Sequence, residues 1–155
     1  MKIFKRTLIV LLIILLVLPV VSYIGIIITN NTIADKIEKD LIAYELPINT
    51  ELVDSISVAG KLTGNGNGMQ YVGAIFVDSG LSKEELKEYY SSEFDYIEVN
   101  EQETVNLDFI QNVSFDADIV SGDKTYYSII YWNDNRREIF GDFISELLDF
   151  DIRGH

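Results

Sequence analysis

Cysteine is missing from this chain of 155 residues, and histidine occurs once, at the last position. Without cysteine there are no disulfides, no cysteine-ligated zinc, no thiol nucleophiles and no acylated lipobox cysteine. A Ser-His-Asp triad needs a firmly held histidine, whereas a terminal residue such as His155 is usually mobile. The sequence also has no Gly-Lys-Ser/Thr phosphate loop. Composition therefore removes several common kinds of catalytic site.

Charge is missing from the 22 residues between Thr7 and Ile28, which are mostly Leu, Ile and Val. As an α-helix this stretch would be about 33 Å long, enough for a hydrocarbon core of about 30 Å. Backbone groups find no water in lipid, so a spanning segment of this kind must be helical. We predict that residues 7–28 form a transmembrane helix in contact with the lipid bilayer. Pro19 lies inside it, and membrane helices tolerate proline.

The charges on either side of the apolar run predict its orientation. Lys2, Lys5 and Arg6 precede the run, and every Asp and Glu follows it. By the positive-inside rule, residues 1–6 should be cytoplasmic and residues 29–155 extracytoplasmic. The alternative is a cleaved signal peptide, whose apolar core has about 7–15 residues before a small-x-small site. Val20-Val21-Ser22 matches that site poorly and the run continues beyond it, so we prefer a retained signal-anchor at the cell membrane.

The exported part is strongly acidic, with 9 basic against 25 acidic residues. Nucleic acids and anionic lipid surfaces need Lys and Arg to neutralise their phosphates, so we predict no nucleic-acid partner. The charge either keeps the domain soluble or attracts cations or a basic partner. An exported domain without disulfides is typical of Gram-positive surface proteins, and the abundance of Ile, Asn and Lys indicates a low-GC genome.

Periodicity predicts helices and strands after the apolar run. Asn30-Asn31-Thr32 should break the first helix, with Thr32 capping a separate amphipathic helix over 32–44. Alternation predicts strands over 52–62 and 69–77, joined as a hairpin. Ser82 and Glu85 match a capping box that opens a short helix. Further strands are expected at 94–100, 104–110, 113–120 and 125–132, and a closing helix at 139–148 despite Gly141.

The order of these elements predicts the fold class. Runs of strands joined by short turns indicate a mainly antiparallel sheet, with two or three helices gathered on one face. The last two predicted strands flank a four-residue turn at 121–124 and should pair as a hairpin. We expect a transmembrane helix followed by one small α+β domain over residues 29–155.

A glycine-rich loop is the first candidate binding site: Gly64, Asn65, Gly66, Asn67 and Gly68. Such loops can expose backbone N–H groups to a phosphate or carboxylate. Nucleotide loops need a strand before and a helix after, whereas this one lies between two predicted strands. We interpret it as a hairpin loop that tolerates positive φ, and as a loop that can contact a ligand or partner.

The second candidate is an aromatic surface on the last predicted strand: Tyr127, Tyr131 and Trp132. Alternation puts Tyr126, Ile130 and Trp132 on one face, and Tyr127 and Tyr131 on the other. Exposed Tyr and Trp are favoured at interfaces. A central strand covered on both faces would look the same, and core packing is the preferred role for most of these residues.

Carboxylate pairs suggest two other functions. Asp116 with Asp118, and Asp149 with Asp151, could serve a small envelope hydrolase as acid and base, or bind calcium. Neither pair follows the EF-hand pattern, and a solvated strand face explains the first. We predict no cofactor and no metal. The preferred function is a membrane-anchored binding module for another envelope protein or a wall component, with the hydrolase and the calcium-responsive domain as alternatives.

Overall fold

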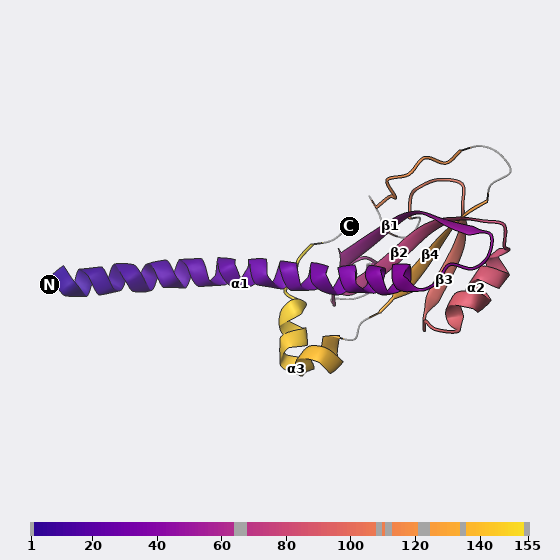
Figure 1. Cartoon of the computed structure of the whole chain (residues 1–155). Coiled ribbons are helices and arrows are strands. Elements are labelled where there is room, and N and C mark those ends of the chain that lie inside the picture. The colour runs from indigo at the N-terminus through magenta and orange to yellow at the C-terminus, as the bar shows by residue number, and fades with distance from the viewer. Residues whose placement is uncertain are drawn as a thin grey trace.

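The computed structural model describes residues 2–63, 68–107, 110, 113–120, 125–133 and 136–153. The elements in chain order are α1 (Lys2–Ala43), β1 (Thr50–Gly60), β2 (Gln70–Ser79), α2 (Lys83–Ser91), β3 (Ile97–Gln102), β4 (Tyr126–Trp132) and α3 (Arg136–Leu148). The four strands form one antiparallel sheet (Figure 1). The predicted α+β class, with a long apolar N-terminal helix, is confirmed.

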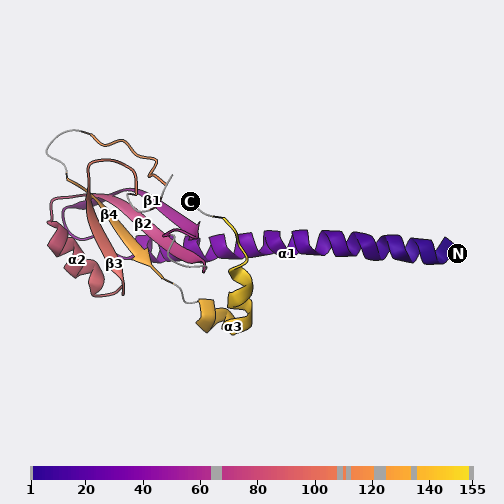
Figure 2. The ribbon, with the colours of Figure 1, turned by 180° about the vertical axis from the view of Figure 1, so that it is seen from behind.

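Helix α1 has two parts that meet different surroundings. Its first part stands clear of the rest of the molecule, and its last part lies along the sheet (Figures 1 and 2). Side chains from Phe4 to Ser22 are exposed, and the first fully buried residue along the helix is Asn30. The first part is long and apolar enough to cross a bilayer. From Ile33 onward the buried residues recur at helical spacing and pack on the sheet: Ile33, Ile37 and Leu41.

The predicted helix break at Asn30-Asn31-Thr32 is wrong, because α1 is continuous through these residues and through Pro19. The hydroxyls of Thr29 and Thr32 donate to the carbonyls of Gly25 and Ile28, at 2.9 and 2.8 Å, which are bonds compatible with a continuing helix. The side chain of Asn30 bonds to distant parts of the chain instead of capping a new helix. Tertiary contacts here override the local preference for a cap.

The strand order is β1-β2-β4-β3. Strands β1 and β2 pair as the predicted hairpin, with Val58 opposite Val72. Strand β4 pairs with both β2 and β3, so it is central rather than the partner of residues 113–120. Strands predicted at 104–110 and 113–120 are wrong for the residues described there, which form only an isolated bridge between Asn106 and Ser114. The predicted turn at 121–124 lies outside the described residues.

The described residues between 103 and 120 lie over one face of the sheet instead of pairing at an edge (Figure 1). Its apolar side chains pack against residues of β1, β2 and β4 in one cluster: Leu107, Ile110, Val113 and Phe115 against Val58, Val72, Phe76 and Ile130. Phe76 stacks with Phe115, with ring centroids 5.0 Å apart. An extended chain lying on a sheet alternates apolar and polar residues as a strand does, which explains the wrong prediction.

Helices α1 and α2 cover the opposite face of the sheet. The capping box of α2 is confirmed, because Ser82 and Glu85 exchange side-chain and backbone hydrogen bonds. These bonds, first from the Ser82 backbone and then from its hydroxyl, lower the pKa of Glu85. Both faces of the sheet are therefore covered.

Helix α3 closes the fold and is kinked. It begins three residues before the predicted start and turns at Gly141, where φ is 73° and ψ is 169°. Glycine adopts this conformation at little cost. In both views α3 lies beside α1, with its second half at a steep angle to that helix, on the side of the domain nearest the exposed part of α1 (Figures 1 and 2).

Helix α1 approaches the backbone of the sheet closely at Gly73. A Cβ built there would lie 2.5 Å from the backbone nitrogen of Glu38 and 2.8 Å from the carbonyl carbon of Ile37. We expect Gly73→Ala to lower the free energy of unfolding by about 1–3 kcal/mol, because two backbones must move apart. Denaturant unfolding of the full chain in detergent micelles, followed by the fluorescence of its single tryptophan, measures this.

Gly80→Ala is the matched control. A Cβ at Gly80 would meet Asn49 at 3.6 Å, an ordinary contact, and we expect a change within about 0.5 kcal/mol. Equal effects of the two substitutions would contradict the close packing of α1 on β2.

Candidate functional site

A cleft of about 540 Å³ opens at the end of the sheet where β2 and β3 begin and β4 ends. Its lining is mainly apolar and aromatic, with a few polar groups: Thr63, Met69, Gln70, Tyr71, Tyr96, Ile97, Glu98, Trp132 and Asn133. Concave sites that combine apolar walls with few polar groups are the usual form of ligand sites. Three strands and the base of the β1–β2 hairpin contribute, so the cleft depends on the whole sheet.

Tyr96 forms an exposed wall of this cleft and has an unusual backbone. Its side chain is 83% exposed, and its φ is 59°, in the left-handed region. That conformation costs a bulky residue about 1–2 kcal/mol, and glycine or asparagine would adopt it more easily. Strained residues of this kind cluster at binding and catalytic sites. Tyr96 is thus an aromatic side chain kept in solvent at an energetic cost.

The predicted aromatic surface is divided by the structure. Trp132 is half-buried and lines the cleft. Tyr131 is half-buried on the opposite face, where its ring packs edge-on against Phe94 and its hydroxyl accepts a hydrogen bond from Asn133 at 2.9 Å. Tyr127 is buried, with 5% of its surface exposed, so it is a core residue and no part of a surface. The predicted alternation of faces is observed, and β4 is a central strand covered on both sides.

The two residues that flank the glycine-rich loop lie at the cleft. Gly64, Asn65, Gly66 and Asn67 are outside the described residues, and their predicted ligand contact stays a prediction. Thr63 and Met69, which flank them, both line the cleft. The side chain of Gln70 accepts hydrogen bonds from the backbone of Leu62 and Thr63, each at 2.9 Å, and so fixes one end of the loop.

Gly68 lies against the closing helix rather than in the cleft. A Cβ at Gly68 would be 3.6 Å from a carboxylate oxygen of Asp149. The same carboxylate accepts a hydrogen bond from the backbone of Met69 at 2.8 Å and pairs with Arg136 at 2.6 Å. The second end of the loop is therefore fixed to α3.

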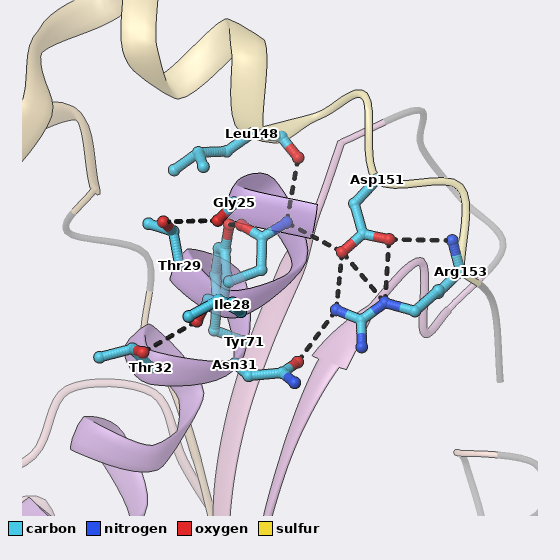
Figure 3. Close-up of polar contacts among 10 residues, drawn as sticks. Gly25, Ile28, Thr29, Asn31, Thr32, Tyr71, Leu148, Asp151 and Arg153 are labelled. Carbon is cyan, nitrogen blue, oxygen red and sulfur yellow. Dashed lines mark hydrogen bonds and ion pairs between the residues drawn. The ribbon is translucent and has the colours of Figure 1, made fainter. Parts of the chain in front are cut away.

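A buried hydrogen-bond network lies next to the cleft, where α1 enters the domain; we call it the Asn30 network (Figure 3). Its members are Asn30, Asn31, Tyr71, Leu148, Asp151 and Arg153. The hydroxyl of Tyr71 donates to Asn30 Oδ1 at 2.6 Å. Asn30 Nδ2 donates to the carbonyl of Leu148 at 3.1 Å and to Asp151 at 3.0 Å.

Arg153 completes the Asn30 network (Figure 3). Its guanidinium binds Asp151 through Nε at 3.0 Å and Nη2 at 2.7 Å, and Nη2 also donates to Asn31 Oδ1 at 2.9 Å. Asp151 has no exposed surface. The chain after α3 is therefore held on α1 by charge-assisted bonds, which are the stronger kind.

These contacts give the second carboxylate pair a structural role. Asp149 pairs with Arg136, and Asp151 pairs with Arg153. In the first pair, the backbone N–H of Asp116 donates a hydrogen bond to the carboxylate of Asp54 at 2.6 Å. Within the described ranges, no three His, Asp or Glu side chains gather as a metal ion would need.

The Asn30 network also changes the acidity of Asp151. Burial alone would raise the pKa of this carboxyl, but hydrogen bonds from Arg153, from Asn30 and from the Arg153 backbone together outweigh it. The pKa therefore lies below its ordinary value of 3.8. A depressed folded-state pKa stabilises the fold at neutral pH, and the stabilisation is lost as pH falls through that pKa.

Sequence patterns did not identify Tyr96 as a strained residue of the cleft, nor Asn30 as the centre of a buried hydrogen-bond network. Tyr96 falls inside the predicted strand 94–100, where nothing signals a positive φ. Asn30 was interpreted as a helix break. One signal could have identified the role of Asn30. It lies two residues beyond the apolar run, and apolar residues continue at helical spacing after it, as expected for one unbroken helix.

Comparison with protein-family models, curated proteins and solved structures finds no match for this chain. Its function must therefore be argued from the cleft and the contacts around it.

We expect Tyr96→Gly to be more stable than Tyr96→Ala by about 1 kcal/mol, because both lose the ring but only glycine relieves the left-handed strain. Thermal unfolding of the two full-length variants, followed by circular dichroism, measures the difference. If alanine were as stable as glycine, residue 96 would not be strained.

We expect Asp151→Asn to lower the free energy of unfolding at pH 7 by about 1–3 kcal/mol, because charge-assisted bonds to Arg153 are lost. The difference from the natural protein should shrink as pH falls below 3.8, the ordinary pKa of this carboxyl, and vanish below its lowered pKa in the folded state. Denaturant unfolding over a pH series measures both effects. Arg153→Met should remove the same pH dependence, and a difference that persists unchanged at pH 3 would contradict the role of the charge.

Proposed function

We propose that this chain is a single-pass membrane protein whose extracytoplasmic domain binds a segment of another envelope protein in the cleft. The observation that carries the proposal is Tyr96, exposed and strained beside Trp132 on the cleft wall. Selection for stability alone would favour glycine or asparagine at that backbone position. A bulky aromatic residue there is explained by contact with a ligand, since Tyr and Trp dominate binding energy at interfaces.

The lining of the cleft indicates the chemistry of the ligand. Its walls are apolar and aromatic, and Glu98 is the one carboxylate among the lining residues. The domain around it has a large excess of acidic residues. An apolar or aromatic segment flanked by Lys or Arg fits both features, because the apolar part fills the cleft and the acidic surroundings attract the flanks.

The position of the cleft indicates where this partner is found. Tyr71 lines the cleft and bonds to Asn30, which follows the apolar run by two residues, or about 3 Å along the helix. If residues 7–28 span the membrane with residues 1–6 in the cytoplasm, the cleft opens close to the outer membrane surface. A protein anchored in the same membrane would meet it at high effective concentration.

Site-specific photocrosslinking in intact cells tests this function. A photoreactive phenylalanine analogue is placed at Tyr96 or at Ile48, which are 83% and 84% exposed. Ile48 follows the opposite end of α1 and is the matched control. We expect Tyr96, and not Ile48, to give one discrete adduct.

The adduct at position 96 should fall at least about tenfold when Trp132→Ala removes the neighbouring aromatic side chain of the cleft, which corresponds to the loss of one hot spot. Equal labelling from both positions, or an adduct unaffected by Trp132→Ala, would show that the cleft is not the binding site.

A further inference from the structure

The closing helix and the residues after it expose an unusual amount of apolar surface. Phe143 is 72% exposed, Phe150 66% and Ile152 78%. Three further large apolar side chains on α3 are at least 39% exposed: Ile139, Phe140 and Ile144. Six exposed apolar residues within 14 positions of the chain are typical of a surface that something else covers.

This surface adjoins the part of α1 that we assign to the membrane. The carbonyl of Leu148, at the end of α3, accepts a hydrogen bond from Asn30. At the other end of α3, Ile139 and Phe140 line a groove together with Ile28, the last residue of the apolar run. Apolar side chains of α3 therefore lie next to the end of the apolar run of α1.

The direction of α3 matches this position. The second half of α3, after the kink at Gly141, lies beside α1 at a steep angle to it, near the exposed apolar stretch (Figures 1 and 2). This half ends at Leu148, which bonds to Asn30, so it lies close to the plane of the membrane surface if α1 runs along the membrane normal. Amphipathic helices bind membranes in this orientation, with the apolar side at the boundary of headgroups and acyl chains.

We propose that α3 and residues 149–152 form a second membrane contact, in which Phe143, Phe150 and Ile152 insert into the outer interface of the bilayer. This inference rests on the proposed membrane anchor. Under this proposal, one defined face of the domain contacts the lipid, in addition to the helix that spans the bilayer.

Apolar burial, not charge, must drive this contact. The exposed charges of α3 are mostly acidic, with Glu138, Asp142 and Glu146 against Arg137. Arg136 and Arg153 are engaged with Asp149 and Asp151. Anionic headgroups would not attract such a surface. The contact needs little intrinsic affinity, since α1 already holds α3 at the membrane and makes insertion an intramolecular step.

Electron paramagnetic resonance of single nitroxide labels tests the proposal, and the natural absence of cysteine gives a clean background. The full-length variants Phe143→Cys, Ile48→Cys and Leu15→Cys are labelled and reconstituted in phosphatidylcholine vesicles. All three positions are well exposed, at 72%, 84% and 69%, so the labels leave the core intact. Collisions with oxygen, which partitions into lipid, are compared with collisions with a neutral water-soluble nickel chelate.

We expect the oxygen-to-nickel ratio at Phe143 to approach that at Leu15 and to exceed that at Ile48 several-fold. Adding phosphatidylglycerol should leave the ratio at Phe143 unchanged, and a rise would overturn the apolar mechanism. A water-like label at Phe143 with a lipid-like label at Leu15 would overturn this inference and leave the anchor intact. A water-like label at Leu15 would overturn the anchor itself.

Two further outcomes would show that something other than lipid covers the apolar residues of α3. A label at Phe143 that is shielded from both reagents and broadened by a neighbouring spin would show that a second copy of the chain covers α3. Shielding from both reagents without broadening would show burial within the protein. Either result overturns the lipid contact.

Discussion

The structure depends on the burial of one amide side chain, that of Asn30. Helix α1 is mostly exposed and apolar before this residue and packs on the sheet after it. One helix must therefore be compatible with two environments, and Asn30 lies at the boundary between them. Its amide bonds link α1 to β2 through Tyr71 and to the end of the chain through Leu148 and Asp151. A buried amide without these partners would cost stability, so the three segments must come together for any of them to be stable there.

Local patterns predicted most of the elements, since each depends on nearby residues. The capping box at Ser82 and the β1–β2 hairpin are local arrangements, and both are observed. The prediction that failed at residues 104–120 concerned pairing, which alternation does not determine. Alternation of apolar and polar residues indicates only that one side of a segment is apolar. The described residues of this segment bury that side against the face of the sheet and do not pair along its edge.

The candidate site was only partly predictable for a related reason. Trp132 could be singled out by residue type, and the structure places it in the cleft. Gly68 of the predicted loop lies against Asp149 and Arg136 instead, and it is the flanking residues Thr63 and Met69 that line the cleft. Tyr127, of the same type and on the same strand, is in the core because β4 is central. Strand order decides which aromatic residues reach solvent, and it arises from contacts far apart in the sequence. The strain at Tyr96 is likewise a property of the tertiary structure.

The continuity of α1 has a mechanical consequence. Helix α1 has no loop between Ile28 and Ala43, and the Asn30 network clamps it to the sheet and to the chain end. No flexible connection therefore joins the apolar stretch to the domain, and the domain must tilt and rotate together with the helix. Each residue of an α-helix turns about 100° around the axis, so inserting one residue before Asn30 would leave the domain intact but aim it in a different direction. If the apolar stretch spans a membrane as proposed, its number of residues thus sets which neighbours in the membrane plane the cleft can face.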